Sequence, residues 1–292
     1  MNSLAELIIK VRPHLSPGSV KTYIANLKRI GIETRSDIEK LKSPEFLFDQ
    51  FEGEKLSTKR NMTSSALIIA MAEYPDNQEI WEPIRQRMFD LGTEYNELIA
   101  KNEKSDTQEK NWVKLEELKK IANKLLKENP KSQDSLIAGL YTMQPPTRLD
   151  FYDMEIMDGK AEMSDKKNYL VIHNTRRKEF VFNDFKTKNK YNQVIIKVNK
   201  DLNRVINKFL KLNPDRKYLL QKVRSPQPLS RNQLGKAIPI IFKETGKNVT
   251  LNIIRHVYIS EQVDLEALKK FQEIAKSMMH SQSMQQEYAK TD

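Results

Sequence analysis

The sequence predicts an α+β fold that is mostly α-helical, with one small antiparallel sheet in its second half. Residues 1–103 contain helical patterns and no strand-like run. Three short apolar runs between 167 and 198 are separated by polar turns, and helical patterns resume after them. We therefore expect a helical domain at 1–103 and an α+β domain at 112–292. The polar, charged residues 104–111 have little to bury and are expected to form a linker.

The clearest helix of the N-terminal domain starts at Ser16. This serine can cap the helix, Pro17 fits the first helical position, and Gly31 can end it. Apolar residues between these ends recur at intervals of three and four, which is typical of an amphipathic helix. Ser57 is expected to cap a second helix, and a third is expected from about 78 to 102.

In the second domain, helices are expected before and after three strands along the chain. The paired prolines at 145–146 end the helix that precedes the sheet. The expected strands are KNYLVIHN, EFVFNDF and QVIIKV, with turns at NTRRK and KTKNKYN. The expected helices cover 113–128, 132–143, 201–212, 231–246, 251–262 and 265–280.

The positive charge of the chain is concentrated in one segment. The net charge is +11, but residues 166–250 hold 21 Lys and Arg against 5 Asp and Glu, a local +16, which leaves −5 for the remainder. One interpretation is a solvated lysine-rich surface. The other is a face that binds a polyanion, because clustered Lys and Arg neutralise phosphates and release condensed counterions.

The composition also disfavours several classes of protein. There is no cysteine for a disulfide or a thiolate metal site, and the four histidines at 14, 173, 256 and 280 lack a metal-ligand spacing. No metal or other cofactor is expected. The longest apolar run, ALIIAMA at 66–72, is far shorter than the roughly 20 residues that span a bilayer. We expect a soluble intracellular protein without a membrane partner, in the cytoplasm or the nucleus.

Two arginines far apart in the chain have apolar flanks, Arg148 in TRLDF and Arg255 in NIIRH. Burying a charge is costly without a partner of opposite charge. An arginine also stays protonated and can donate twice to one phosphate. The pair therefore indicates a phosphate-binding site, in which Asp150 can orient a neighbouring basic group.

Four segments, QPPTRLDFYDM, FKTKNK, LNIIRH and MMHSQSMQQEY, together resemble the motifs of the tyrosine recombinase (phage-type integrase) family. They span 144–288, in a form similar to versions found in large DNA viruses and related mobile elements. The resemblance implies a core-binding domain at 1–103 and a catalytic domain at 112–292. It also implies a site-specific recombinase or integrase that cleaves and rejoins DNA through a 3′-phosphotyrosine, without metal or ATP. The implied partners are double-stranded DNA and a homo-tetramer on paired sites, with no small-molecule substrate.

The resemblance assigns a role to each matched residue. Tyr288 is the expected nucleophile, since a tyrosine can store the phosphodiester energy in a covalent bond. Lys186 is the expected general acid, with Lys188 as the alternative. The expected groups around the phosphate are Arg148, Arg255, His280 and Asn252, with Asp150 and His256 supporting them. The expected DNA-binding residues outside this group are Arg176, Arg177, Lys188 and Lys190.

One position departs from the family pattern. Most members carry histidine where this chain carries Asn252, and asparagine can donate a hydrogen bond but cannot take a proton near neutral pH. Two other functions remain open, of which Asn252 motivates the second. One is a type IB topoisomerase, which uses the same chemistry as a monomer. The other is a catalytically weakened DNA-binding regulator that keeps the fold.

Overall fold

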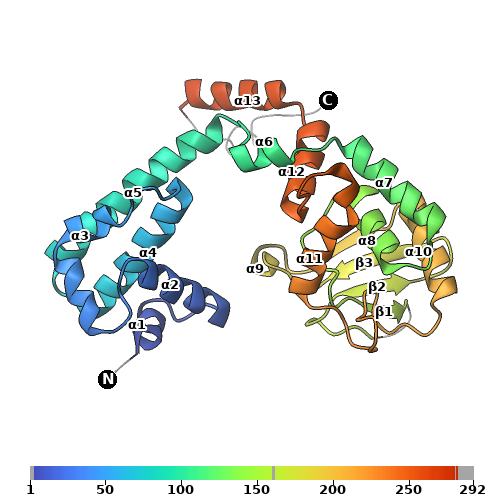
Figure 1. Cartoon of the computed structure of the whole chain (residues 1–292), viewed down its shortest axis with the longest axis horizontal. Helices are drawn as coiled ribbons and strands as arrows, with labels where there is room; N and C mark the ends of the chain where they lie inside the picture. The colour runs from blue at the N-terminus through green and yellow to red at the C-terminus, as the bar shows by residue number, and fades with distance from the viewer. Residues whose placement is uncertain (1–2, 160–161, 280, 282–292) are drawn as a thin grey trace. The chain divides into compact units, whose positions relative to one another are not determined.

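The computed structural model describes residues 3–159, 162–279 and 281, and it divides the chain into two compact units (Figure 1). The first unit is Met1–Glu103 and the second is Lys104–Asp292. Each unit has a hydrophobic core of its own. In the described part of the chain, no helix combines the length and the apolarity that crossing a membrane requires.

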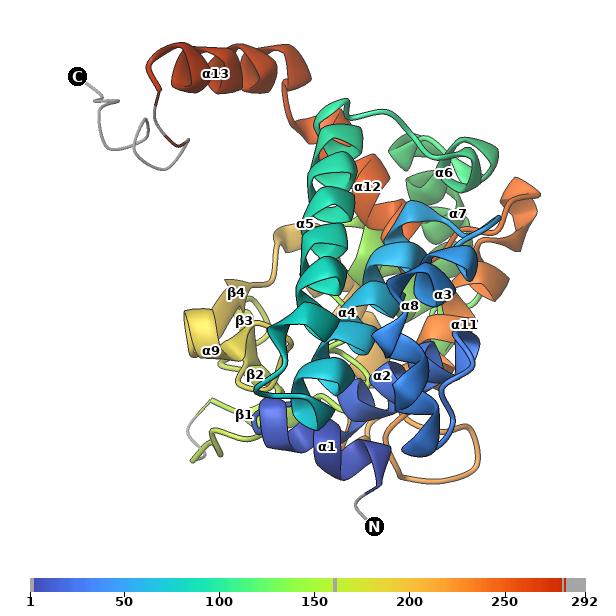
Figure 2. The ribbon, with the colours of Figure 1, turned by 90° about the vertical axis from the view of Figure 1, so that its left-hand side faces the viewer.

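The first unit is helical throughout and is organised around its fourth helix. Its elements are α1 (Leu4–Val11), α2 (Pro17–Arg29), the 3-10 helix η1 (Ser36–Lys42), α3 (Pro44–Asp49), α4 (Leu56–Glu73) and α5 (Gln78–Ala100). Helix α4 packs against α1, α2 and α5, and Figure 2 shows it alongside the long α5. Its run Ala66–Ala70 is buried on all sides, which explains why that stretch is continuously apolar.

The ends of α2 confirm the prediction from the sequence. The Ser16 side chain accepts a hydrogen bond from the Ser19 amide, and Pro17 is the first helical residue. Gly31 has a φ of +73°, and the amides of Gly31 and Ile32 close the helix on the carbonyls of Lys28 and Leu27.

The expected cap at Ser57 was wrong. Helix α4 begins at Leu56, so Ser57 is its second residue, and the position before the helix is Lys55, whose side chain makes no capping bond.

The expected linker 104–111 contains a helix, α6 (Asp106–Asn111). Ser105 and Gln108 form a capping box, in which each side chain bonds the main-chain amide of the other. Asn111 also accepts from the Asn248 amide, so this segment is attached to the second unit. The local capping residues and this distant bond explain why a polar segment is ordered.

In the second unit, one buried helix is surrounded by other helices. Its remaining helices are α7 (Leu115–Glu128), α8 (Gln133–Thr142), α9 (Lys188–Tyr191), α10 (Lys200–Leu212), α11 (Arg231–Ile241), η2 (Lys243–Thr245), α12 (Leu251–Gln262) and α13 (Leu265–Ser277). Helix α8 is buried over most of its length and packs against α7, α10, α11 and α12. Helix α13 is largely exposed. Of its described side chains, that of Ala275 is buried.

The sheet is mixed and has four strands in the order β1-β2-β3-β4, not three antiparallel strands as expected. The strands are β1 (Glu155–Asp158), β2 (Tyr169–Ile172), β3 (Lys178–Phe182) and β4 (Val194–Lys197). The three expected strands pair antiparallel, whereas β1 adds parallel to β2 at the edge. Strand β1 has four residues and no clear alternation of burial, so its pairing depends on the position of β2 and not on its own pattern.

The alternation of side chains along the central strands positions the sheet. Leu170, Phe180 and Phe182 face the main core of the unit, while Tyr169 and Val181 belong to a small cluster on the other face. The core face thus lies against α8, α11 and α12, whose buried residues belong to the same core.

Candidate active site

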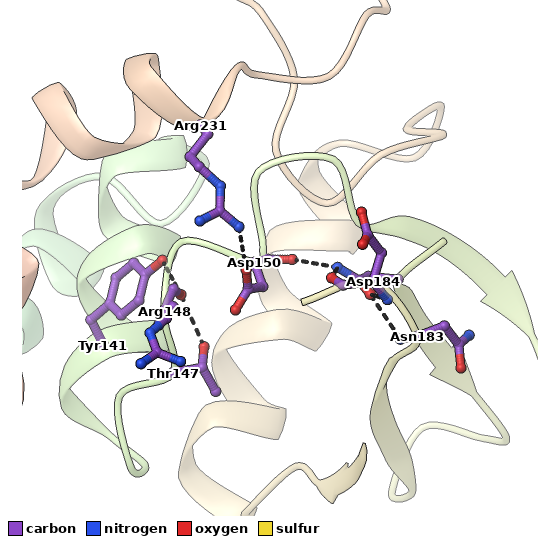
Figure 3. Close-up of polar contacts among 8 residues, drawn as sticks. Tyr141, Thr147, Arg148, Asp150, Asn183, Asp184 and Arg231 are labelled. Carbon is purple, nitrogen blue, oxygen red and sulfur yellow. Dashed lines mark hydrogen bonds and ion pairs between the residues drawn. The ribbon is translucent and has the colours of Figure 1, made fainter. Parts of the chain in front are cut away.

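Arg148 lies on the loop that follows α8, just after the paired prolines (Figure 3). Its side chain is exposed, but its main chain is held from behind. The carbonyl oxygen of Arg148 accepts a hydrogen bond from the hydroxyl of Tyr141 at 3.3 Å. Tyr141 is completely buried, and burial, followed by the nearby charge of Asp150, raises the pKa of its hydroxyl, which keeps it a donor.

Arg255 reaches the same loop from α12. Its Nη1 donates to the carbonyl oxygen of Pro146 at 3.1 Å, across 109 positions of sequence. Burial lowers the pKa of Arg255, and the charge of Arg148 lowers it further, but an arginine remains protonated near neutral pH. The positive charge of the exposed Arg148 therefore acts on the half-buried Arg255, an arrangement that an anion between them would stabilise.

Asp150 is the buried acid of this group, and its partner is Arg231. Oδ1 of Asp150 lies 2.5 Å from Nη2 of Arg231, and Figure 3 shows Arg231 reaching down to it from α11. Burial raises the pKa of Asp150, while the charges of Arg231 and then Arg148 oppose that rise. The expectation that Asp150 orients a basic group thus finds its group in Arg231.

Arg231 was missed in the sequence. It is the first residue of α11 and follows Ser230, which forms a capping box with Gln233. The capping residues indicate where the helix begins, but nothing local shows that its first side chain meets an acid 81 positions earlier. Its guanidinium also lies over the ring of Tyr152, 5.5 Å from the centroid.

The two candidate lysines differ in their surroundings. Lys188, in α9, donates from Nζ to the carbonyl oxygen of Asp165 at 2.9 Å. Lys186 lies in the turn between β3 and α9, is exposed, and makes no hydrogen bond or ion pair with another described residue. A lysine that has to reach a substrate oxygen needs an unengaged ammonium, so these contacts favour Lys186.

Asn252 and His256 are both exposed on α12. Asn252 precedes Arg255 by three positions, so the two lie on neighbouring parts of the helix surface. His256 makes no hydrogen bond with another residue of the described ranges. Each helical residue is rotated by about 100° from the one before it, which turns His256 away from the side that Arg255 occupies.

The expected DNA-binding residues are separated by the length of β3. Arg176 and Arg177 precede this strand, whereas Lys188 and Lys190 follow it. The start of β2 lies at the second of these ends, because Tyr169 pairs with Val181 near the end of β3. Asp150 lies there too, since its carbonyl oxygen accepts a hydrogen bond from Asn168, the residue before β2. The two arginines therefore do not join the group around Arg148.

Lys178 attaches the turn that carries Arg176 and Arg177 to α10. Its buried ammonium donates to Oδ1 of Asn203 at 2.9 Å and of Asn207 at 2.6 Å. Burial lowers the pKa of Lys178. Arg177 itself pairs with Glu179 at 3.1 Å, which leaves Arg176 as the more available cation of this turn.

His280 and Tyr288 lie outside the described residues. The described ranges contain no group of three or more Asp, Glu or His placed to hold a metal ion.

A cavity of about 470 Å³ is lined by Gln133, Arg216 and 221–226, and it includes none of the site residues. The candidate site is thus an exposed surface with the cations Arg148 and Lys186, and the buried polar residues Tyr141 and Asp150 support it from the interior.

The sequence matches no protein-family model and no curated protein. The functional argument therefore depends on the residues and their geometry.

Proposed function

We propose that the chain is a site-specific DNA recombinase of a virus or mobile element, which cleaves and rejoins DNA through a 3′-phosphotyrosine. The observation that carries the proposal is that Arg255, from α12, bonds the loop that carries Arg148, and that Asp150 on the same loop pairs with Arg231. A scissile phosphate develops negative charge on its non-bridging oxygens, and two neighbouring guanidiniums are suited to stabilise it.

In the proposed reaction the oxygen of Tyr288 attacks the phosphorus of the scissile phosphodiester. A bond forms between that oxygen and phosphorus, and the bond from phosphorus to the 5′ oxygen breaks. The departing oxygen takes a proton from the ammonium of Lys186, and the tyrosine proton passes to water, since Asn252 cannot accept it. His280 donates to a phosphate oxygen.

The phosphotyrosine keeps the energy of the broken bond, so no ATP is needed to rejoin the strand. Strand exchange follows when the free 5′-hydroxyl of a partner site attacks the phosphotyrosine and releases Tyr288. Four copies of the chain on two paired duplex sites perform the complete reaction. The basic segment 166–250 supplies cations for the DNA backbone, with a net local charge of +16.

The first prediction is that the chain forms a covalent adduct with DNA through Tyr288. The substrates are nicked duplexes with a randomised core, from which the short cleaved strand diffuses away and leaves the adduct trapped. A denaturing gel should show a protein–DNA band with the unaltered chain and none with Tyr288→Phe. Tyr218→Phe is the matched control, because it removes a hydroxyl of the same unit outside the site and should leave the band.

Other outcomes favour the other two functions. Relaxation of supercoiled plasmids at any sequence, by a protein that stays monomeric on DNA, would favour a topoisomerase. DNA binding without an adduct on any substrate would favour a regulator, the function that the asparagine at 252 makes conceivable. In that case Asn252→His is the variant to test for restored cleavage.

A further inference from the structure

Asn168 is a buried side chain whose hydrogen-bonding capacity is fully used. It directly precedes β2 and is 3% exposed. Its Nδ2 donates to the carbonyl oxygens of Asp150, at 3.1 Å, and Asp184, at 2.9 Å. Its Oδ1 accepts from the amides of Asn183 and Asp184, both at 2.9 Å. Two donors and two lone pairs are thus all satisfied by main-chain groups.

These four bonds join the two segments that carry the proposed catalytic groups. Asp150 follows Arg148 by two positions, and Asp184 precedes Lys186 by two. Figure 3 shows the loop at Asp150 connected by dashed contacts to the segment that contains Asp184. In the described ranges no other side chain hydrogen-bonds to both segments.

We infer that Asn168 is a positioning residue that holds the turn of the general acid against the arginine loop. The inference rests on the proposed function, in which Lys186 and Arg148 act on the same phosphate. Lys186 itself makes no bond with a described residue, so its location depends on the main chain at 183–184. That main chain is bonded to Asn168 at three points.

The requirement for such a tether follows from the chemistry. A general acid has to lie within hydrogen-bond reach of the oxygen that leaves, and a displacement of about 1 Å can slow a reaction on the order of 100-fold. Asn168 is suited to prevent that displacement, because a buried hydrogen bond has no competing water.

The variant Asn168→Asp tests the positioning role, because it removes the bonds that join the two segments and keeps the rest of the side chain's shape. It replaces the donating nitrogen with an oxygen, so the carbonyls of Asp150 and Asp184 lose their donor, while the bonds from the two amides are kept. Asn203→Ala is the matched control. Asn203 is also a buried asparagine that bonds a turn, through Nδ2 to the carbonyl of Thr175, but at the other end of β3.

The test uses a bridging sulfur in place of the 5′ oxygen at the scissile phosphate, in a sequence that the unaltered chain cleaves. Thiolate leaves without a proton, so this substrate does not need the general acid. We expect Asn168→Asp to form the adduct on the order of 100-fold more slowly with oxygen and within a few-fold of the unaltered chain with sulfur. Lys186→Ala should show the same pattern. Asn203→Ala should show no difference between the two substrates.

Equal slowing of Asn168→Asp on both substrates, or no slowing with oxygen, would overturn the positioning role alone. Failure of sulfur to restore Lys186→Ala would overturn the assignment of the acid, and the role of Asn168 with it. Absence of any adduct with the unaltered chain would overturn the proposed function itself. If Asn168→Asp does not fold, Asn168→Ser is measured in its place, because its short, neutral side chain lacks both the nitrogen and the oxygen that make the four bonds.

Discussion

At Asp150, the stability of the second unit depends on whether the carboxyl group of this one residue is ionised. Its carboxylate is mostly buried, and burial raises its pKa although Arg231 lies against it. The ionised form is therefore less favourable in the folded chain than in the unfolded chain. This side chain contributes most to stability when protonated, below the unfolded pKa of about 3.9, and the contribution is lost as pH rises through the folded pKa.

We predict that the difference in free energy of unfolding between the unaltered chain and Asp150→Asn changes with pH. Asparagine resembles the protonated carboxyl and does not titrate, so the unaltered chain should lose stability relative to the variant as pH rises from about 4 through the raised pKa. Denaturant unfolding over a pH series measures it. Asp215→Asn, at an exposed acid of the same unit, is the control. A difference that stays constant or grows in the opposite direction would contradict the prediction.

Among elements, the loop that carries Arg148 is anchored by Phe151. This ring is completely buried and packs edge-on against Tyr141, Phe180 and Phe182, with centroids 5.7, 5.0 and 5.6 Å away. It therefore joins α8, the loop and β3. The anchor lies three positions after Arg148, so the exposed guanidinium projects from a rigid base.

We predict that Phe151→Ala lowers the free energy of unfolding of the second unit by about 3–5 kcal/mol, because it removes these ring contacts and leaves a cavity. Phe151→Leu keeps much of the apolar volume and should lose less. Denaturant unfolding of both variants gives the comparison. An equal loss for the two, or a loss well below about 1 kcal/mol for alanine, would show that the ring does not anchor the loop.

In the whole molecule, the two cores contain no common residue. The core of the first unit contains Leu47 and that of the second contains Phe151, each fully buried. Chains with two separate cores commonly depart from a single two-state transition.

We predict that calorimetric unfolding requires two transitions. Leu47→Ala should lower the midpoint of one transition, since such a truncation costs about 2–5 kcal/mol, and Phe151→Ala should lower the midpoint of the other. A single transition moved by both variants would mean that the units unfold together.

The sequence by itself determined those features that depend on residues close together in the chain. Ser16, Pro17 and Gly31 act within one turn of the helix ends they define, so the bounds of α2 could be predicted. The short apolar runs likewise predicted three strands, and the structure has β2, β3 and β4 within those runs or one residue from them.

Only the tertiary structure decided the features that join distant segments. Strand β1 pairs because β2 presents an edge, Arg231 meets Asp150 across 81 positions, and Asn168 bonds main-chain groups up to 18 positions away. A side chain that bonds main-chain groups of distant segments leaves no pattern in the sequence, unlike a helix cap, because every residue other than proline has the same amide and carbonyl. The partners of such a side chain depend on how the chain packs, and so they became known only from the fold.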